Sequence, residues 1–195
     1  MNTVAVISKH PGSGQTTVLV NLASGLVRSG YRVIIGELGK SGKIHNWLGV
    51  NHKPKQVVDM VLPTTASIKP NISSSPLGID LVTLVEEPQT TPLDLTCLEM
   101  LGYDYLLLHP SGNEYCKQLA MLTTATIVCT DLTHDNELKE FQALEECLQS
   151  LGKGNGIDLI LPNKINTQEW EQNTQQLFAL VDYFGYEKIA DPIPL

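Results

Sequence analysis

The chain alternates between short runs of apolar, mostly β-branched residues and longer segments whose apolar residues recur every three or four positions. The short runs predict strands, and the longer segments predict helices. We expect strands at 3–7, 32–37, 79–84, 104–109, 125–130 and 157–161. We expect helices at 16–29, near 54–61, and at 92–101, 113–121, 135–151 and 168–184.

Strands that alternate with helices are typical of a parallel sheet with helices on both faces. The run Leu106-Leu107-Leu108 is apolar at every position, as expected of a strand covered on both sides. The pattern therefore predicts an α/β fold, with a single three-layer α/β/α domain over residues 1–195. Its mainly parallel sheet should have about six to eight strands, with 3–7 and 104–109 as central neighbours.

A glycine-rich turn joins the first predicted strand to the first predicted helix, and it reads Ser8-Lys9-His10-Pro11-Gly12-Ser13-Gly14-Gln15-Thr16-Thr17. Strand, glycine-rich turn and helix are the setting of a P-loop, G-x-x-x-x-G-K-[ST], which holds phosphates with backbone N–H groups and a lysine. Here Gln15 stands at the lysine position and carries no charge. Gly12 and Gly14 still leave the backbone open to a phosphate, and Thr16 offers a hydroxyl. The alternative is a turn that uses its glycines only for geometry.

Four further groups of residues follow later strands or lie near the end of the chain. They are Glu37 and Gly39 ahead of Trp47-Leu48-Gly49, His109 with Pro110-Ser111-Gly112, Asn163 with Lys164, and Ile193-Pro194. Because the carboxyl ends of parallel strands meet at one edge of a sheet, we expect Glu37, His109 and Asn163 to share one site with the turn.

These motifs, in this order, resemble the MinD/ParA family of deviant P-loop ATPases, and the resemblance runs from about Met1 to Leu195. The family's turn reads K-G-G-x-G-K-T-T, whose leading lysine falls on His10, with Lys9 one place early. The resemblance implies ATP or ADP with magnesium as the ligand. It implies that nucleotide is held by Lys9, Gly12, Ser13, Gly14, Gln15, Thr16 and Thr17, with Asn163 reading the adenine.

Three positions depart from the family pattern, and each departure removes charge. Gln15 replaces the lysine of the turn, Gly39 replaces the second Asp of an Asp-x-Asp element, and His109 replaces the Asp that ends the central strand. Phosphoryl transfer depends on charge stabilisation, so we expect a pseudo-ATPase with no catalytic residue, no metal-ligating residue and only weak nucleotide binding. The alternative is an active but unusual ATPase in which Lys9, Lys40 or a partner chain supplies the charge.

The resemblance also implies partners and a cellular setting. We expect a protein-binding module for positioning or assembly of pilus, flagellum, partition or envelope machinery, forming a homodimer across the P-loop face. The net charge of −8 argues against a broad nucleic-acid surface. A solvated face is our interpretation of the basic cluster Lys40, Lys43, His45, His52, Lys53 and Lys55.

The end of the chain and its cysteines complete the expectations. Family members usually continue past the Ile-Pro motif with further helices, and MinD-type proteins add a membrane anchor. Here Ile193-Pro194 are followed only by Leu195, so we expect neither the further helices nor the anchor. The four cysteines match no zinc spacing. They predict reduced thiols in a cytoplasmic protein.

Overall fold

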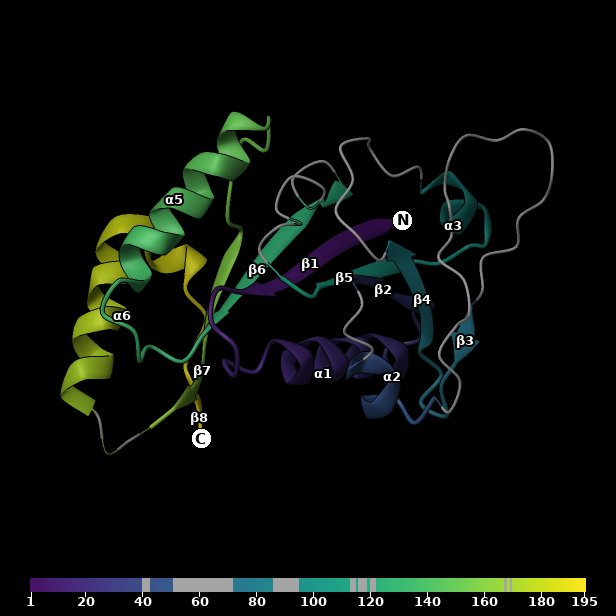
Figure 1. Cartoon of the computed structure of the whole chain (residues 1–195), viewed down its shortest axis with the longest axis horizontal. Coiled ribbons are helices and arrows are strands. Elements are labelled where there is room, and N and C mark those ends of the chain that lie inside the picture. Colours follow the sequence, from purple (N-terminus) through teal and green to yellow (C-terminus); the bar gives the residue numbers. More distant parts are fainter. Residues whose placement is uncertain are drawn as a thin grey trace. The chain divides into compact units, whose positions relative to one another are not determined.

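The computed structural model describes residues 1–39, 43–50, 72–85, 95–112, 115, 119, 122–166, 168 and 170–195. The chain divides into two compact units. The first unit contains Met1–Ala5 and Thr16–Thr124, and the second contains Val6–Gln15 and Ala125–Leu195. Figure 1 labels the helices and strands of both units.

The strands are β1 (Asn2–Ser8), β2 (Val33–Leu38), β3 (Ser73–Ser74), β4 (Asp80–Val85), β5 (Tyr105–Pro110), β6 (Ala125–Thr130), β7 (Leu159–Ile165) and β8 (Ile193–Pro194). They form an eight-stranded sheet with the hydrogen-bonded order β3-β4-β2-β5-β1-β6-β7-β8. Within each unit the pairs are parallel, apart from the antiparallel pair of β3 and β4. The predicted α/β fold with a mainly parallel sheet is therefore confirmed.

The helices are α1 (Gln15–Arg28), α2 (Lys43–Trp47), α3 (Thr96–Met100), α5 (Glu137–Ser150) and α6 (Trp170–Phe184), with a short 3₁₀ helix, η3 (Tyr186–Lys188). The predictions for 16–29, 135–151 and 168–184 are confirmed to within two residues. The helix expected near 54–61 lies outside the described residues, as do most of 113–121 and the first residues of 92–101. No helix in the described part of the chain is both long and apolar enough to cross a membrane.

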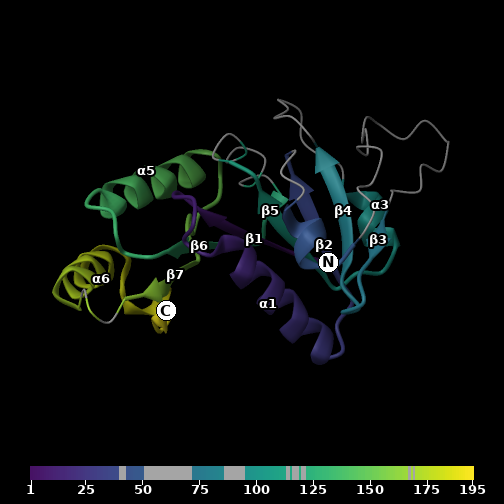
Figure 2. The same cartoon turned by 60° about the horizontal axis from the view of Figure 1, so that its bottom comes forward.

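The first unit is built on the parallel pairing of β2, β5 and β1. Asn2 to Ala5 of β1 lie beside Tyr105 to Leu108 of β5, which confirms that 3–7 and 104–109 are neighbours. Every residue of β2 is buried. A Cβ at Gly36 of β2 would crowd Leu84 and Leu108, so glycine lets the strands' side chains pack at that point. Figures 1 and 2 show α1 running alongside these strands, and its buried residues are Leu19, Val20 and Ala23.

The second unit contains β6, β7 and β8 with α5 and α6. The two helices lie side by side in Figures 1 and 2. The core of this unit includes Val128 on β6, Ile160 on β7, Phe141 on α5 and Leu180 on α6, all at most 1% exposed. Apolar residues at helical spacing on α5 and α6 meet the apolar strands, which is the packing that the sequence pattern predicts.

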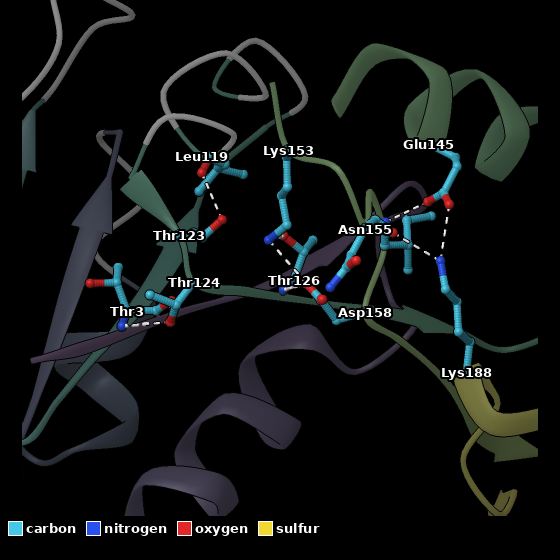
Figure 3. Close-up of polar contacts among 11 residues, drawn as sticks. Thr3, Leu119, Thr123, Thr124, Thr126, Glu145, Lys153, Asn155, Asp158 and Lys188 are labelled. Atoms are coloured by element: carbon cyan, nitrogen blue, oxygen red, sulfur yellow. Dashed lines mark hydrogen bonds and ion pairs between the residues drawn. The ribbon is translucent and has the colours of Figure 1, made fainter. Parts of the chain in front are cut away.

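Charged side chains connect the segment before β7 to its surroundings within the second unit (Figure 3). Lys153, only 9% exposed, donates from Nζ to the Thr126 hydroxyl at 2.7 Å and lies 3.1 Å from the Asp158 carboxylate. Asp158 in turn accepts the backbone N–H of Thr126 at 2.7 Å. A second pair joins Lys188 to Glu145 of α5 at 3.0 Å. Buried charges are tolerated only when they are paired in this way.

We predict that Lys153→Met destabilises the protein by about 2 kcal/mol, because Asp158 loses its cation while the aliphatic stem is kept. Urea unfolding followed by circular dichroism measures the change. Lys139→Met is the matched control, since Lys139 is exposed on α5 and should change stability by no more than about 0.5 kcal/mol. Equal midpoints for the two variants would contradict a structural role for Lys153.

Candidate functional site

The glycine-rich turn between β1 and α1 has the backbone shape that the sequence predicts. Gly12 and Gly14 both have positive φ angles, +99° and +90°, which residues with a Cβ rarely adopt. A Cβ at Gly14 would also collide with the side-chain amide of Asn163. Glycine is therefore required at position 14 for two reasons, its backbone angle and the close approach of β7.

Side-chain donors hold three carbonyl groups of the turn, within the second unit. Asn163 Nδ2 donates to the Ser13 carbonyl at 2.8 Å, and Lys164 Nζ donates to the Gly12 carbonyl at 2.7 Å. The Ser13 hydroxyl donates to the His10 carbonyl at 3.1 Å. Among the described residues, the N–H groups of Gly12, Ser13 and Gly14 have no hydrogen-bond acceptor.

Gln15 turns back toward β1. Its Nε2 donates to the Val6 carbonyl at 2.9 Å, and its Oε1 accepts from the Ser8 hydroxyl at 3.3 Å. A neutral side chain satisfied by both contacts packs at the base of the turn, where a lysine could not accept a hydrogen bond. Gln15 therefore has a structural place in the turn.

His10 connects the turn to α5 and the segment before it. Its Nε2 lies 2.9 Å from a carboxylate oxygen of Glu140. Its ring stacks on His134, with centroids 3.6 Å apart and an interplanar angle of 25°. The position that the family pattern gives to a lysine is thus occupied by an imidazole paired with a carboxylate.

A second polar group lies in the first unit, at the carboxyl ends of β2 and β5. His109 and Glu37 are register partners across these strands, and both are at most 3% exposed. His109 Nε2 lies 3.1 Å from the Thr16 hydroxyl, so the two share a hydrogen bond whose direction depends on the imidazole tautomer. His45 of α2 lies 3.4 Å from Glu37 and is 3% exposed. The solvated face expected for the basic cluster is therefore wrong for His45.

Gly39 follows β2 with a φ of +105°, and a Cβ there would collide with the Ser111 hydroxyl. The backbone angle and the nearby Ser111 side chain therefore favour glycine at the position of the family's second Asp. Packing against the segment after β5 leaves no room for a side chain.

The residues at these strand ends do not fit magnesium. Mg²⁺ requires oxygen ligands in near-octahedral geometry. The Thr16 hydroxyl is bonded to an imidazole, and the Glu37 carboxylate faces His45. Phosphate fits the turn better, because three successive N–H groups and the positive end of a helix can hold an anion without a metal.

A buried carboxyl group lies after the end of β6, in the second unit, and sequence reasoning missed it. Glu137, the first residue of α5, is fully buried and accepts a hydrogen bond from the Thr130 hydroxyl. Among the described residues its second oxygen, Oε1, has no hydrogen-bond partner. Burial raises the pKa of Glu137 above the ordinary value, an effect that the Thr130 hydrogen bond opposes.

The structure brings together some of the predicted site residues. Gly12, Ser13, Gly14, Gln15 and Asn163 meet in the second unit. Asn163, the predicted adenine reader, here donates to the turn itself. That Glu37, His109 and Asn163 share one site stays a prediction, since Glu37 and His109 belong to the first unit.

The remaining predicted residues have less defined places. Thr16 and Thr17 are the second and third residues of α1 and belong to the first unit, and the Thr17 carbonyl accepts a hydrogen bond from Asn21 at 2.9 Å. Lys40 lies outside the described residues. Lys9 lies in the turn and makes no side-chain hydrogen bond or ion pair within the part of the chain that is described. The lysine that does contact the turn is Lys164, whose only sequence signal was its place directly after Asn163.

Comparison with known proteins identifies the fold. No protein-family model matches the sequence, and no curated protein matches it. Solved structures do match. A putative plasmid partition protein from Borrelia burgdorferi B31, bound to AMPPNP, is 14% identical with a TM-score of 0.76, covering 100% of this chain and 86% of that one.

Two further structures show the same likeness. The MinC:MinD cell division protein complex of Aquifex aeolicus contains a chain 15% identical, with a TM-score of 0.72, covering 100% of this chain and 81% of that one. Cobyrinic acid a,c-diamide synthase from Mycobacterium smegmatis, with bound ADP and magnesium, is 17% identical with a TM-score of 0.71. The match covers 99% of this chain and 86% of that one. The fold predicted from the resemblance is therefore confirmed.

We predict that Glu137→Gln changes the pH dependence of stability. A carboxyl whose pKa is raised by folding holds its proton more tightly in the folded state. The native protein should therefore lose stability as pH rises from the ordinary glutamate value through the raised one. Urea midpoints of the native protein and Glu137→Gln, measured from acid to neutral pH, should diverge in favour of the glutamine variant. Parallel curves would contradict the raised pKa.

Proposed function

We propose, from the premise that the chain has the fold of the MinD/ParA-type P-loop ATPases, that it is a pseudo-ATPase. In this proposal it binds adenine nucleotide weakly, does not hydrolyse it, and acts by binding other proteins. The observation that carries the proposal is the hydrogen bond between the Thr16 hydroxyl and the buried imidazole of His109. In this proposal a nitrogen base stands at the position where the family resemblance implies the carboxylate that metal-dependent phosphoryl transfer needs.

The turn supports the binding half of the proposal. Its N–H groups at Gly12, Ser13 and Gly14 lack acceptors among the described residues, and α1 begins directly after them. Such a cradle favours phosphate through the helix dipole, by about 1 kcal/mol. This contribution is small beside the roughly 4 kcal/mol to which a 1 mM affinity corresponds, so we expect weak binding of ADP or ATP, in the high-micromolar to millimolar range. Bound ADP and AMPPNP in two of the similar structures support nucleotide as the ligand class.

The second half of the proposal concerns protein partners, and it names no specific one. A structurally similar protein, MinD, was solved with its partner MinC, which supports protein binding as a use of this fold. We propose a role in positioning or assembly of a larger machine, with a homodimer formed across the P-loop face. The proposal includes a cytoplasmic setting, in which the free thiols of Cys129 and Cys147 stay reduced.

We predict that purified protein with magnesium and ATP releases phosphate at a rate far below about one per second, because the charges that stabilise the transition state are absent. A phosphate-release assay measures the rate, and Thr16→Ala is the matched variant. A slow background unchanged by Thr16→Ala agrees with the proposal. Turnover near about one per second that Thr16→Ala abolishes would establish the alternative, an active ATPase.

A further inference from the structure

Among the described residues, a lysine amine on β7 contacts the turn from elsewhere in the second unit. Lys164 Nζ lies 2.7 Å from the Gly12 carbonyl. Its Cε lies 3.7 Å from the position of a Cβ at Gly14, so the aliphatic stem passes over the turn's second glycine. The charge that Gln15 lacks is thus present next to the same glycines, on strand β7.

The backbone of β7 is distorted at this lysine. Lys164 has a φ of +59°, in the left-handed region that lysine rarely adopts. The register of β7 with β8 also shifts between Asn163 and Ile165. A bulge of this kind re-aims a side chain. Here it coincides with two consecutive side chains, Asn163 and Lys164, that both donate to the turn.

The ammonium of Lys164 has N–H donors that make no hydrogen bond within the described residues. A lysine ammonium has three N–H donors, and one of them is used by the Gly12 carbonyl. Within the described residues Lys164 makes no other side-chain hydrogen bond or ion pair, and it is exposed. The adjacent N–H groups of Gly12, Ser13 and Gly14 also lack acceptors there. A cation and N–H groups without acceptors, both belonging to or touching this turn, suit an anion with several oxygens.

We infer that Lys164 replaces the missing lysine of the turn, and that it contacts the phosphates of a diphosphate group held by Gly12, Ser13 and Gly14. The inference rests on the proposed nucleotide binding and names the residue on which that binding depends. Lys164 is a binding residue here, and no chemical step is assigned to it. An ammonium contact to a phosphate oxygen strengthens the interaction through charge, so affinity should depend on salt.

The test uses two probes, ADP and inorganic pyrophosphate, titrated while the backbone amide NMR signals of Gly12, Ser13 and Gly14 are followed. The decisive variant is Lys164→Gly, because glycine accepts the left-handed backbone that lysine strains. It should fold with an equal or higher melting temperature while it loses the amine. Lys164→Arg keeps the charge, and Lys139→Met removes one charge from an exposed position of α5 that makes no hydrogen bond or ion pair with the described residues of the turn.

We expect Lys164→Gly to weaken binding of both probes at least about tenfold, and Lys164→Arg to stay within about threefold of the native protein. Lys139→Met should bind as the native protein does. The native affinity should fall as salt rises, and the Lys164→Gly variant should lose most of that dependence. A loss of affinity with the salt dependence unchanged would overturn the inference, because it would indicate that the amine only shapes the turn.

Two other results would also overturn the inference. One is native affinity in Lys164→Gly, and the other is a larger loss in Lys9→Met than in Lys164→Gly. In both cases nucleotide binding itself would stand. If neither probe shifts the three amide signals of the native protein, the proposed nucleotide binding fails with it, and that result is seen in the native protein alone.

Discussion

The parallel pairing of β2 with β5 is the constraint on which the first unit depends. It is continuous from Val33 beside Tyr105 to Leu38 beside Pro110, and it fixes which side chains meet at the carboxyl ends. Glu37 and His109 are partners because of this register. A slip of either strand by one residue would turn its own residue of the pair to the opposite face of the sheet. Buried apolar residues such as Ile34, Ile35, Leu106 and Leu107 hold the register in place.

The fold was predictable because it depends on patterns that repeat along the chain. Runs such as Leu106-Leu107-Leu108 predicted a covered strand, and the spacing in 135–151 and 168–184 predicted helices that the structure contains. The short elements were not predicted: α2 has five residues, and β3 and β8 have two each. Elements this short have too few residues to show a periodic pattern of apolar positions. Whether they form depends on tertiary contacts.

The backbone shape of the candidate site was predictable from the sequence. The contacts made by its side chains were less predictable. Gly12 and Gly14 indicated a positive-φ turn, and the structure has one. The sequence shows that Gln15 is neutral but not that it bonds to Val6 and Ser8. It also gives no measure of the distance between Lys164 and Gly12, which are 152 positions apart. Long-range contacts of this kind come from the fold, which brings β7 to the turn inside the second unit.

The close contact between Gly39 and Ser111 has a consequence for how this chain could change over evolution. A carboxylate at position 39 would need a new backbone angle there and a smaller residue at position 111. Either substitution alone would create a clash or a gap, so the two positions are epistatic. Two coordinated changes are therefore needed before a carboxylate fits at position 39. The packing therefore makes the absence of a second carboxylate at this strand end difficult to reverse by a single substitution.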